Sequence, residues 1–220
     1  MSLIVKICGL STEETLDAAI AAGADMIGLN FFPKSPRYVT PARAAELVAR
    51  VAGRLEVVAL TVDMDETAVD ELAGIVKPDW LQFHGRESVD YVKAARQRTR
   101  RQVMKALPVA EAADLDAAAP YMAVADGLLL DARPPKGAVL PGGNGVPFDW
   151  RLLEGFDPDI PWMLSGGLAP GNVAEAVAIS GAPGVDVSSG VESAPGRKEP
   201  NLIRAFIANA RGQTMQRVAS

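Results

Sequence analysis

IVKICGLSTEETLDAAIAAGADMIGLNF, residues 4–31, is the stretch of sequence that decides the fold. It contains a short apolar run at Ile4–Ile7, an alanine-rich segment with helical spacing at Thr12–Ala22, and a second apolar run at Met26–Phe31. Ser11 has the spacing of a capping box at the start of the helical segment. The pattern therefore predicts a strand, a helix and a second strand, the unit from which parallel sheets are built.

The same alternation continues along the chain, with eight strand-like and eight helical runs in all. The remaining strands are expected at Leu55–Thr61, Trp80–Phe83, Gln102–Ala106, Gly127–Asp131, Trp162–Leu164 and Gly184–Val187. The remaining helices are expected at Pro41–Arg50, Glu66–Val76, Ser88–Arg98, Ala110–Ala118, Trp150–Glu154, Gly171–Ile179 and Pro200–Ala210. Continuous apolar strands separated by helices indicate a parallel sheet, and eight units closing on themselves form a (β/α)8 TIM barrel of the α/β class.

An open, doubly wound sheet is the alternative fold. Its first turn usually carries a glycine fingerprint, which Cys8-Gly9-Leu10-Ser11-Thr12 lacks. No change in composition divides the chain, so residues 1–220 are expected to form one barrel domain with a C-terminal tail from about residue 211. The Pro/Gly-rich stretch Pro134–Pro147 is expected to be a loop over a site.

Composition excludes several classes of function. The chain has 220 residues, a single cysteine (Cys8), a single histidine (His84) and a net charge of −5. One cysteine excludes an internal disulfide and a cysteine-based zinc site, and one histidine excludes a multi-histidine metal centre. The acidic balance argues against nucleic-acid binding, and no apolar run reaches the roughly 20 residues of a membrane span. Since the N-terminus resembles no leader peptide, we expect a cytoplasmic protein with neither a nucleic-acid nor a membrane partner.

Polar residues follow the expected strands at their C-terminal ends, where barrel enzymes carry their active sites. Gly166 and Gly167 follow the seventh strand, and Ser188, Ser189 and Gly190 follow the eighth. Glycine lets backbone N–H groups approach an anion, and hydroxyl groups add further donors. Although glycines also permit tight turns, two such loops at these positions predict a site for a small phosphorylated molecule.

Four further residues are candidates for chemistry. Asp131 ends a wholly apolar strand, so its carboxylate needs a ligand, a raised pKa or a structural partner such as Arg133. Cys8 is either a buried core thiol or a reactive one, and with Asp131 it would supply a base and an acid for proton transfer. Arg37 lies in a loop with two prolines and either binds a carboxylate or is a solvated charge. His84 either donates to a ligand or bonds to the backbone.

Several motifs, taken in order along the chain, resemble those of the phosphoribosylanthranilate isomerases. They are Lys6-Ile7-Cys8-Gly9-Leu10, Pro33-Lys34-Ser35-Pro36-Arg37-Tyr38, Gln82-Phe83-His84-Gly85, Leu128-Leu129-Leu130-Asp131, Pro141-Gly142-Gly143-Asn144-Gly145, Phe148-Asp149-Trp150, Ser165-Gly166-Gly167-Leu168 and Gly184 to Glu192. The similarity runs from Lys6 to about Ala210. Phe83 and Asn144 depart from the expected Leu and Thr or Ser.

The resemblance implies an Amadori rearrangement in tryptophan biosynthesis, from N-(5-phosphoribosyl)anthranilate to 1-(2-carboxyphenylamino)-1-deoxyribulose 5-phosphate. It implies that Asp131 is the general acid, that Cys8 is the general base and that Arg37 receives the anthranilate carboxylate. It further implies that the two glycine loops hold the phosphate and that His84 and Asp186 line the sugar region. No metal or organic cofactor is implied, since the amino nitrogen on the sugar serves as the electron sink.

These roles set requirements on pKa values. An acid at neutral pH needs a raised pKa at Asp131, and a base needs a lowered or offset pKa at Cys8. Strand alternation places Lys6 on the same face as Cys8, and we hypothesise that its positive charge helps to lower or offset the pKa of the thiol. Three other functions are considered. The first is the related histidine-pathway isomerase or a bifunctional version of it, a family that carries aspartate where Cys8 stands. The others are a metal-dependent sugar-phosphate epimerase and a non-catalytic phosphate-binding barrel. Both a monomer and a homodimer agree with the sequence.

Overall fold

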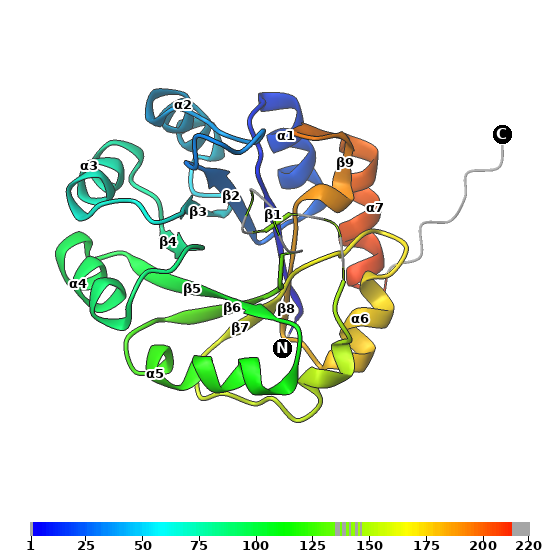
Figure 1. Cartoon of the computed structure of the whole chain (residues 1–220). Coiled ribbons are helices and arrows are strands. Elements are labelled where there is room, and N and C mark those ends of the chain that lie inside the picture. Colours follow the sequence, from blue (N-terminus) through cyan, green and yellow to red (C-terminus); the bar gives the residue numbers. More distant parts are fainter. Residues whose placement is uncertain are drawn as a thin grey trace, which may run out of the picture.

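The computed structural model describes residues 2–134, 137, 140, 142–143, 145 and 147–212. Eight parallel strands hydrogen-bond in sequence order, and β8 pairs with β1, so the sheet closes into a barrel (Figure 1). The strands are β1 (Ile4–Cys8), β2 (Met26–Asn30), β3 (Glu56–Thr61), β4 (Trp80–Phe83), β5 (Gln102–Val109), β6 (Gly127–Ala132), β7 (Trp162–Leu164) and β8 (Gly184–Val187). The predicted TIM barrel is confirmed, and the open sheet is wrong.

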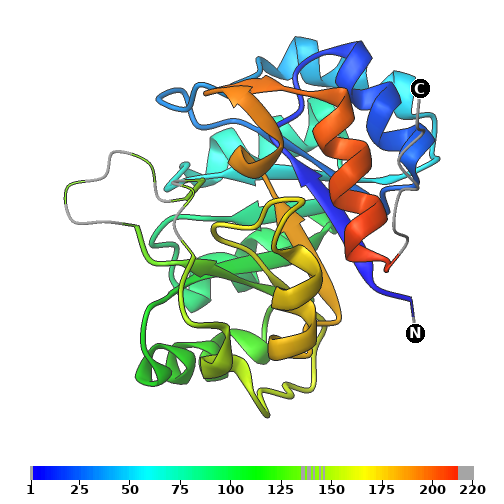
Figure 2. The ribbon, with the colours of Figure 1, turned by 90° about the vertical axis from the view of Figure 1, so that its right-hand side faces the viewer.

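Helices cover the outside of the barrel (Figure 1). The α-helices are α1 (Glu13–Ala22), α2 (Pro41–Val51), α3 (Glu66–Val76), α4 (Val89–Thr99), α5 (Ala119–Met122), α6 (Val173–Ser180) and α7 (Pro200–Ala210), and the 3-10 helices are η1 (Ala112–Ala118), η2 (Trp150–Leu153) and η3 (Ser189–Val191). The last helix, α7, packs beside α1 and completes the ring (Figure 2). No helix among the described residues is both long and apolar enough to cross a bilayer.

The start of α1 differs from the prediction. The N-cap is Thr12, whose hydroxyl accepts from the Thr15 backbone N–H at 3.4 Å, so the expected cap at Ser11 is wrong. Thr12 has an extended backbone, which lets its side chain fold back onto the first turn. A hydroxyl residue at either position satisfies the capping preference, and the sequence alone did not distinguish them.

Three connections also differ. The helix expected at Ala110–Ala118 is the 3-10 helix η1, whose start is fixed by the Asp114 carboxylate accepting from the backbone of Ala110 and Glu111. The short helix expected near Trp150 is likewise 3-10. After β8 the chain forms an antiparallel hairpin of β9 (Glu192–Ala194) and β10 (Arg197–Lys198), which the sequence did not predict because such short strands carry no apolar run.

Strand register decides which side chains face the barrel interior. Lys6 lies opposite Asp186 of β8, and Leu60 of β3 lies opposite Gln82 of β4. Partners in a parallel sheet point to the same side, so alternate residues of every strand share the interior. The floor of this interior is an apolar cluster: Met26, Val58, Trp80, Met104, Ala106, Leu129 and Met163. Polar side chains lie above that floor, toward the C-terminal ends of the strands.

Candidate active site

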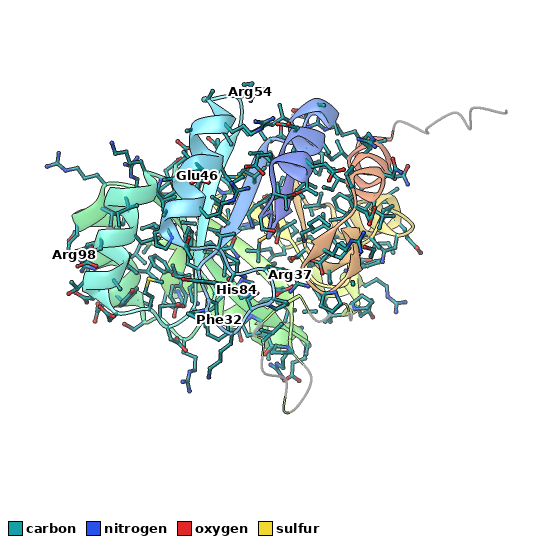
Figure 3. All side chains as sticks on the ribbon, turned by 90° about the horizontal axis from the view of Figure 1, so that it is seen from above. Phe32, Arg37, Glu46, Arg54, His84 and Arg98 are labelled. Atoms are coloured by element: carbon teal, nitrogen blue, oxygen red, sulfur yellow. The ribbon has the colours of Figure 1, made fainter. Side chains whose placement is uncertain are left out.

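A pocket opens at the C-terminal ends of the strands. Its lining includes most of the predicted site residues: Cys8, Arg37, His84, Asp131, Gly166, Gly167, Asp186, Ser188 and Ser189. Viewed from above, Arg37 and His84 lie at the same end of the molecule, whereas Arg54 lies at the opposite end (Figure 3). The barrel thus brings together side chains that are widely separated in the sequence.

Cys8 ends β1 and is 4% exposed. Gly28 of β2 lies directly beside it, and a Cβ at that position would be 2.6 Å from Sγ, so the glycine makes room for the thiol. Burial raises the pKa of Cys8 above its ordinary value, while the positive charges of Lys6, Lys198 and Arg37 oppose the shift. The pKa of Cys8 is therefore raised rather than lowered, but nearby positive charges partly offset that shift, and Lys6 acts in the direction we hypothesised.

Lys6 lies two residues before Cys8 and is wholly buried. Its ammonium donates to Gln82 Oε1 at 2.8 Å and to Asp186 Oδ1 at 3.0 Å. Burial alone would lower the pKa of Lys6, but the negative charges of Asp186 and of a Cys8 thiolate outweigh it and hold that pKa above its ordinary value. Asp186 also accepts from Ser165 Oγ at 3.3 Å. Lys6 therefore places a buried positive charge near the thiol.

Asp131 ends the apolar part of β6 and is buried. Its Oδ2 atom lies 3.0 Å from His84 Nε2, whereas Arg133 pairs with Asp114 and Glu111, so the structural alternative of an Asp131–Arg133 pair is wrong. The other ring nitrogen of His84, Nδ1, lies 2.8 Å from Gln82 Nε2. Both ring nitrogens thus contact side chains, and the alternative of a histidine side chain bonded to the backbone is also wrong.

Gly142 covers the Asp131–His84 pair. A Cβ at this position would lie 2.5 Å from Asp131 Oδ2 and 2.7 Å from His84 Nε2. Any larger residue would therefore displace the pair. Pro141 and Asn144 of the same motif, the other loop residues 135, 136, 138, 139 and 146, and the tail from 213 to 220 lie outside the described residues.

Arg37 is buried rather than a solvated charge, with 6% of its side chain exposed. Glu192, at the start of the unpredicted hairpin, accepts from its Nε at 2.7 Å and from its Nη2 at 2.9 Å. Lys198 also donates to Glu192, at 2.8 Å, and to the backbone carbonyl of Ser188, again at 2.8 Å. The buried carboxylate of Glu192 thus lies between two cations, Arg37 and Lys198. Through it the hairpin connects Arg37 to the loop that contains Ser188.

The two glycine loops lie against each other. Gly166 and Gly167 have positive φ angles of 87° and 66°, which favour glycine. Gly190 does not line the pocket; a Cβ there would lie 1.9 Å from the Leu168 carbonyl oxygen, so it permits the loops to touch. Gly166, Gly167, Ser188 and Ser189 face the pocket.

Sequence reasoning missed three residues that shape the pocket: Gln82, Glu192 and Lys198. A signal existed for Gln82, because it lies two residues before His84 and shares its face by strand alternation. No local pattern links Glu192 to Arg37, from which it is separated by 155 positions. Lys198 occupies a strand of two residues that has no recognisable periodicity.

Comparison with known proteins identifies the family of this chain. The sequence profile of the family described as N-(5'phosphoribosyl)anthranilate (PRA) isomerase matches residues 5–209. N-(5'-phosphoribosyl)anthranilate isomerase of Paramagnetospirillum magneticum is 59% identical over 212 residues, which are 96% of this chain and 99% of that protein.

Two solved structures are similar over 96% of this chain and 99% of their own. A phosphoribosyl anthranilate isomerase in complex with reduced 1-(o-carboxyphenylamino)-1-deoxyribulose 5-phosphate has a TM-score of 0.84 and 32% identity. Monomers of the dimeric phosphoribosylanthranilate isomerase from Thermotoga maritima have a TM-score of 0.83 and 33% identity. The similarity therefore extends to the whole barrel and not to single motifs.

Proposed function

This chain belongs to the phosphoribosylanthranilate isomerase family, and from that premise we propose how its own side chains carry the reaction. It is an isomerase of tryptophan biosynthesis that converts N-(5-phosphoribosyl)anthranilate to 1-(2-carboxyphenylamino)-1-deoxyribulose 5-phosphate by an Amadori rearrangement. Because the chain belongs to this family, we no longer consider the histidine-pathway isomerase, the epimerase or the non-catalytic barrel as its function. The observation that carries the residue assignment is that a buried carboxyl group, Asp131, and a buried thiol, Cys8, line one pocket.

Asp131 acts as the general acid. It donates a proton to the furanose ring oxygen as the bond from that oxygen to C1 breaks, while the lone pair of the amino nitrogen forms the Schiff base. Cys8, as the thiolate, then removes the proton from C2, and the electrons of that C–H bond move toward the nitrogen to give an enolamine. The enolamine tautomerises to the ketone. The substrate nitrogen accepts the electrons throughout, so no step requires a cofactor.

Arg37 receives the anthranilate carboxylate. Its guanidinium has five N–H donors, of which Glu192 takes one on Nε and one on Nη2. Within the part of the chain that the structure describes, the two donors on Nη1 and the second on Nη2 have no other acceptor and can bind a carboxylate, and Arg suits this planar acceptor. Gly143 lies against Nη1, where a Cβ would be 2.9 Å away, so a small residue is needed beside the bound ring.

The phosphate binds where the loops after β7 and β8 meet. Gly167, Ser188 and Ser189 line the pocket there and supply backbone N–H groups and hydroxyls. Lys198 is buried directly behind Ser188 and adds a positive charge. His84 and Asp186 lie between the two anion sites and face the sugar.

We further propose that the protein works in the cytoplasm, because its substrate carries a phosphate and a carboxylate that do not cross a bilayer unaided. The Thermotoga maritima relative is described as dimeric. Every residue that we place in the pocket comes from one chain, so a monomer and a homodimer both fit the proposal.

The test measures turnover of substrate generated in situ from anthranilate and phosphoribosyl pyrophosphate by a transferase, followed as a loss of fluorescence. We expect Cys8→Ser and Asp131→Asn each to lower kcat by about 100-fold or more, the usual contribution of an acid or a base. Asp116→Asn, at an exposed site on η1, is the matched control and should leave kcat unchanged. Near-normal kcat in either pocket variant would remove that residue from its role, and turnover no faster than spontaneous decay in the unaltered protein would contradict the function itself.

A further inference from the structure

Four side chains form one continuous hydrogen-bonded row across the barrel interior. Lys6 lies 2.8 Å from Gln82, Gln82 lies 2.8 Å from His84, and His84 lies 3.0 Å from Asp131. The row connects β1, β4 and β6 and runs from the charge beside the proposed base to the proposed acid. Gln82, at its centre, is fully buried and has no part in the chemistry described above.

The row has a fixed direction, and that direction follows from donor chemistry alone. A lysine ammonium has three N–H donors and no acceptor, so the Gln82 atom facing Lys6 must be the carbonyl oxygen. The amide group of Gln82 therefore faces His84. An amide NH2 can only donate, so His84 Nδ1 must accept and cannot carry a proton.

We propose that Gln82 is a positioning residue that holds His84 as the neutral imidazole with its proton on Nε2. His84 then donates from Nε2 to Asp131 Oδ2, and every bond in the row points from Lys6 toward Asp131. Lys6 secures the far end, because Asp186 accepts a second bond from its ammonium at 3.0 Å. The orientation of Gln82 thus depends on a buried charge pair and not on solvent.

This arrangement argues against His84 as the proton donor, and the consequence rests on the acid role proposed for Asp131. A histidine beside a carboxylic acid would ordinarily compete for its proton. Here Nε2 already carries a hydrogen, and protonation of Nδ1 would place an N–H against the N–H of Gln82. His84 therefore orients Asp131 and does not take its place as the proton donor.

The unaltered protein provides the first test. His84 is the only histidine of the chain, so in a nitrogen-15-labelled sample two ring-nitrogen signals report this one residue. At neutral pH we expect one protonated nitrogen, Nε2, and one unprotonated nitrogen, Nδ1. A proton on Nδ1 would overturn the proposal without any substitution and without reference to activity.

Two substitutions test the role of Gln82 directly. Gln82→Glu replaces the NH2 donor by an acceptor, so Nδ1 should gain a proton. We expect kcat to fall by about 10- to 100-fold, the loss typical when the group that orients a metal-binding histidine is removed. Because Gln82 is placed away from both anion sites, KM should change by less than about threefold. Gln82→Met, which removes both hydrogen bonds with similar volume, should give a mixture of both histidine tautomers.

Gln97→Glu, on the exposed face of α4, is the matched control and should change neither the ring-nitrogen signals nor kcat. An unchanged tautomer in both Gln82 variants would refute the inference even if Asp131→Asn is inactive. Conversely, an active Asp131→Asn enzyme with the expected tautomer would refute the acid assignment and leave the positioning of His84 intact. The two failures are thus distinguishable.

Discussion

Outside the proposed acid and base, we expect removal of a single charge to be most damaging at Glu192. Its carboxylate is 4% exposed and lies 2.7 Å from Arg37 Nε and 2.8 Å from Lys198 Nζ. At these distances an ion pair is worth about 6 kcal/mol at an effective dielectric constant of about 20, before the cost of desolvation. Measured losses on removing one partner of a buried pair are about 3–5 kcal/mol, because the remaining charge stays buried. We expect Glu192→Gln to lower the free energy of unfolding by about 3–5 kcal/mol.

The loss should depend on pH in a defined direction. Burial alone would raise the pKa of Glu192, but its hydrogen bond with Arg37 and the charge of Lys198 outweigh burial and hold that pKa below its ordinary value. A carboxyl group with a lowered pKa in the folded state stabilises the fold above its unfolded pKa and loses that contribution as the pH falls. The difference between unaltered protein and variant should thus be constant above about pH 5 and shrink on acidification below about pH 4.

Urea unfolding at pH 7.5 and at successively lower pH values measures the effect. Arg37 also loses the group that orients it, so KM should rise by about tenfold or more while kcat changes less. Glu71→Gln, at an exposed position of α3, is the control and should stay within about 0.5 kcal/mol. A loss below about 1 kcal/mol together with an unchanged KM would refute the claim that Glu192 holds Arg37 in place.

Three further outcomes follow from the pocket. Lys6→Met should move the titration of Cys8, the only thiol, to higher pH, as measured by its rate of alkylation; an unchanged titration would contradict the role of the lysine charge. Because burial raises the pKa of Cys8 and the base works only as thiolate, kcat/KM should rise with pH above neutrality, and a flat profile from pH 7 to 9 would argue against a thiolate base. Gly190→Ala should push the loop away from the Leu168 carbonyl and weaken binding of inorganic phosphate by about tenfold, whereas Gly171→Ala, with open space around it, should not.

The barrel was predictable because its strands are buried on both faces. Such strands appear as continuous apolar runs, and glycine or capping residues mark the helices between them. Runs such as Trp80–Phe83 and Trp162–Leu164 agree with the structure residue for residue. The 3-10 helix at Ala112–Ala118 was not distinguished from an α-helix, because its alanine-rich spacing fits both kinds of turn.

Residues of the pocket could be predicted from the sequence only where the type and position of a single residue indicate a function. Cys8 and Asp131 are a thiol and a carboxyl group at the ends of apolar strands, and glycines mark the two loops that we propose bind the phosphate. Their partners could not be found in this way. Glu192 acquires its function from Arg37 and Lys198, which reach it only after the barrel has closed and the hairpin has folded back.

The charges around the pocket act on the proposed base in opposite directions. Burial raises the pKa of Cys8, and the negative charge of Asp186 adds to that shift, whereas the positive charges of Lys6, Lys198 and Arg37 lower the pKa. Lys6 acts at both proposed catalytic positions. Its charge favours the thiolate of Cys8 directly, and its hydrogen bond to Gln82 fixes the orientation of the histidine that contacts Asp131.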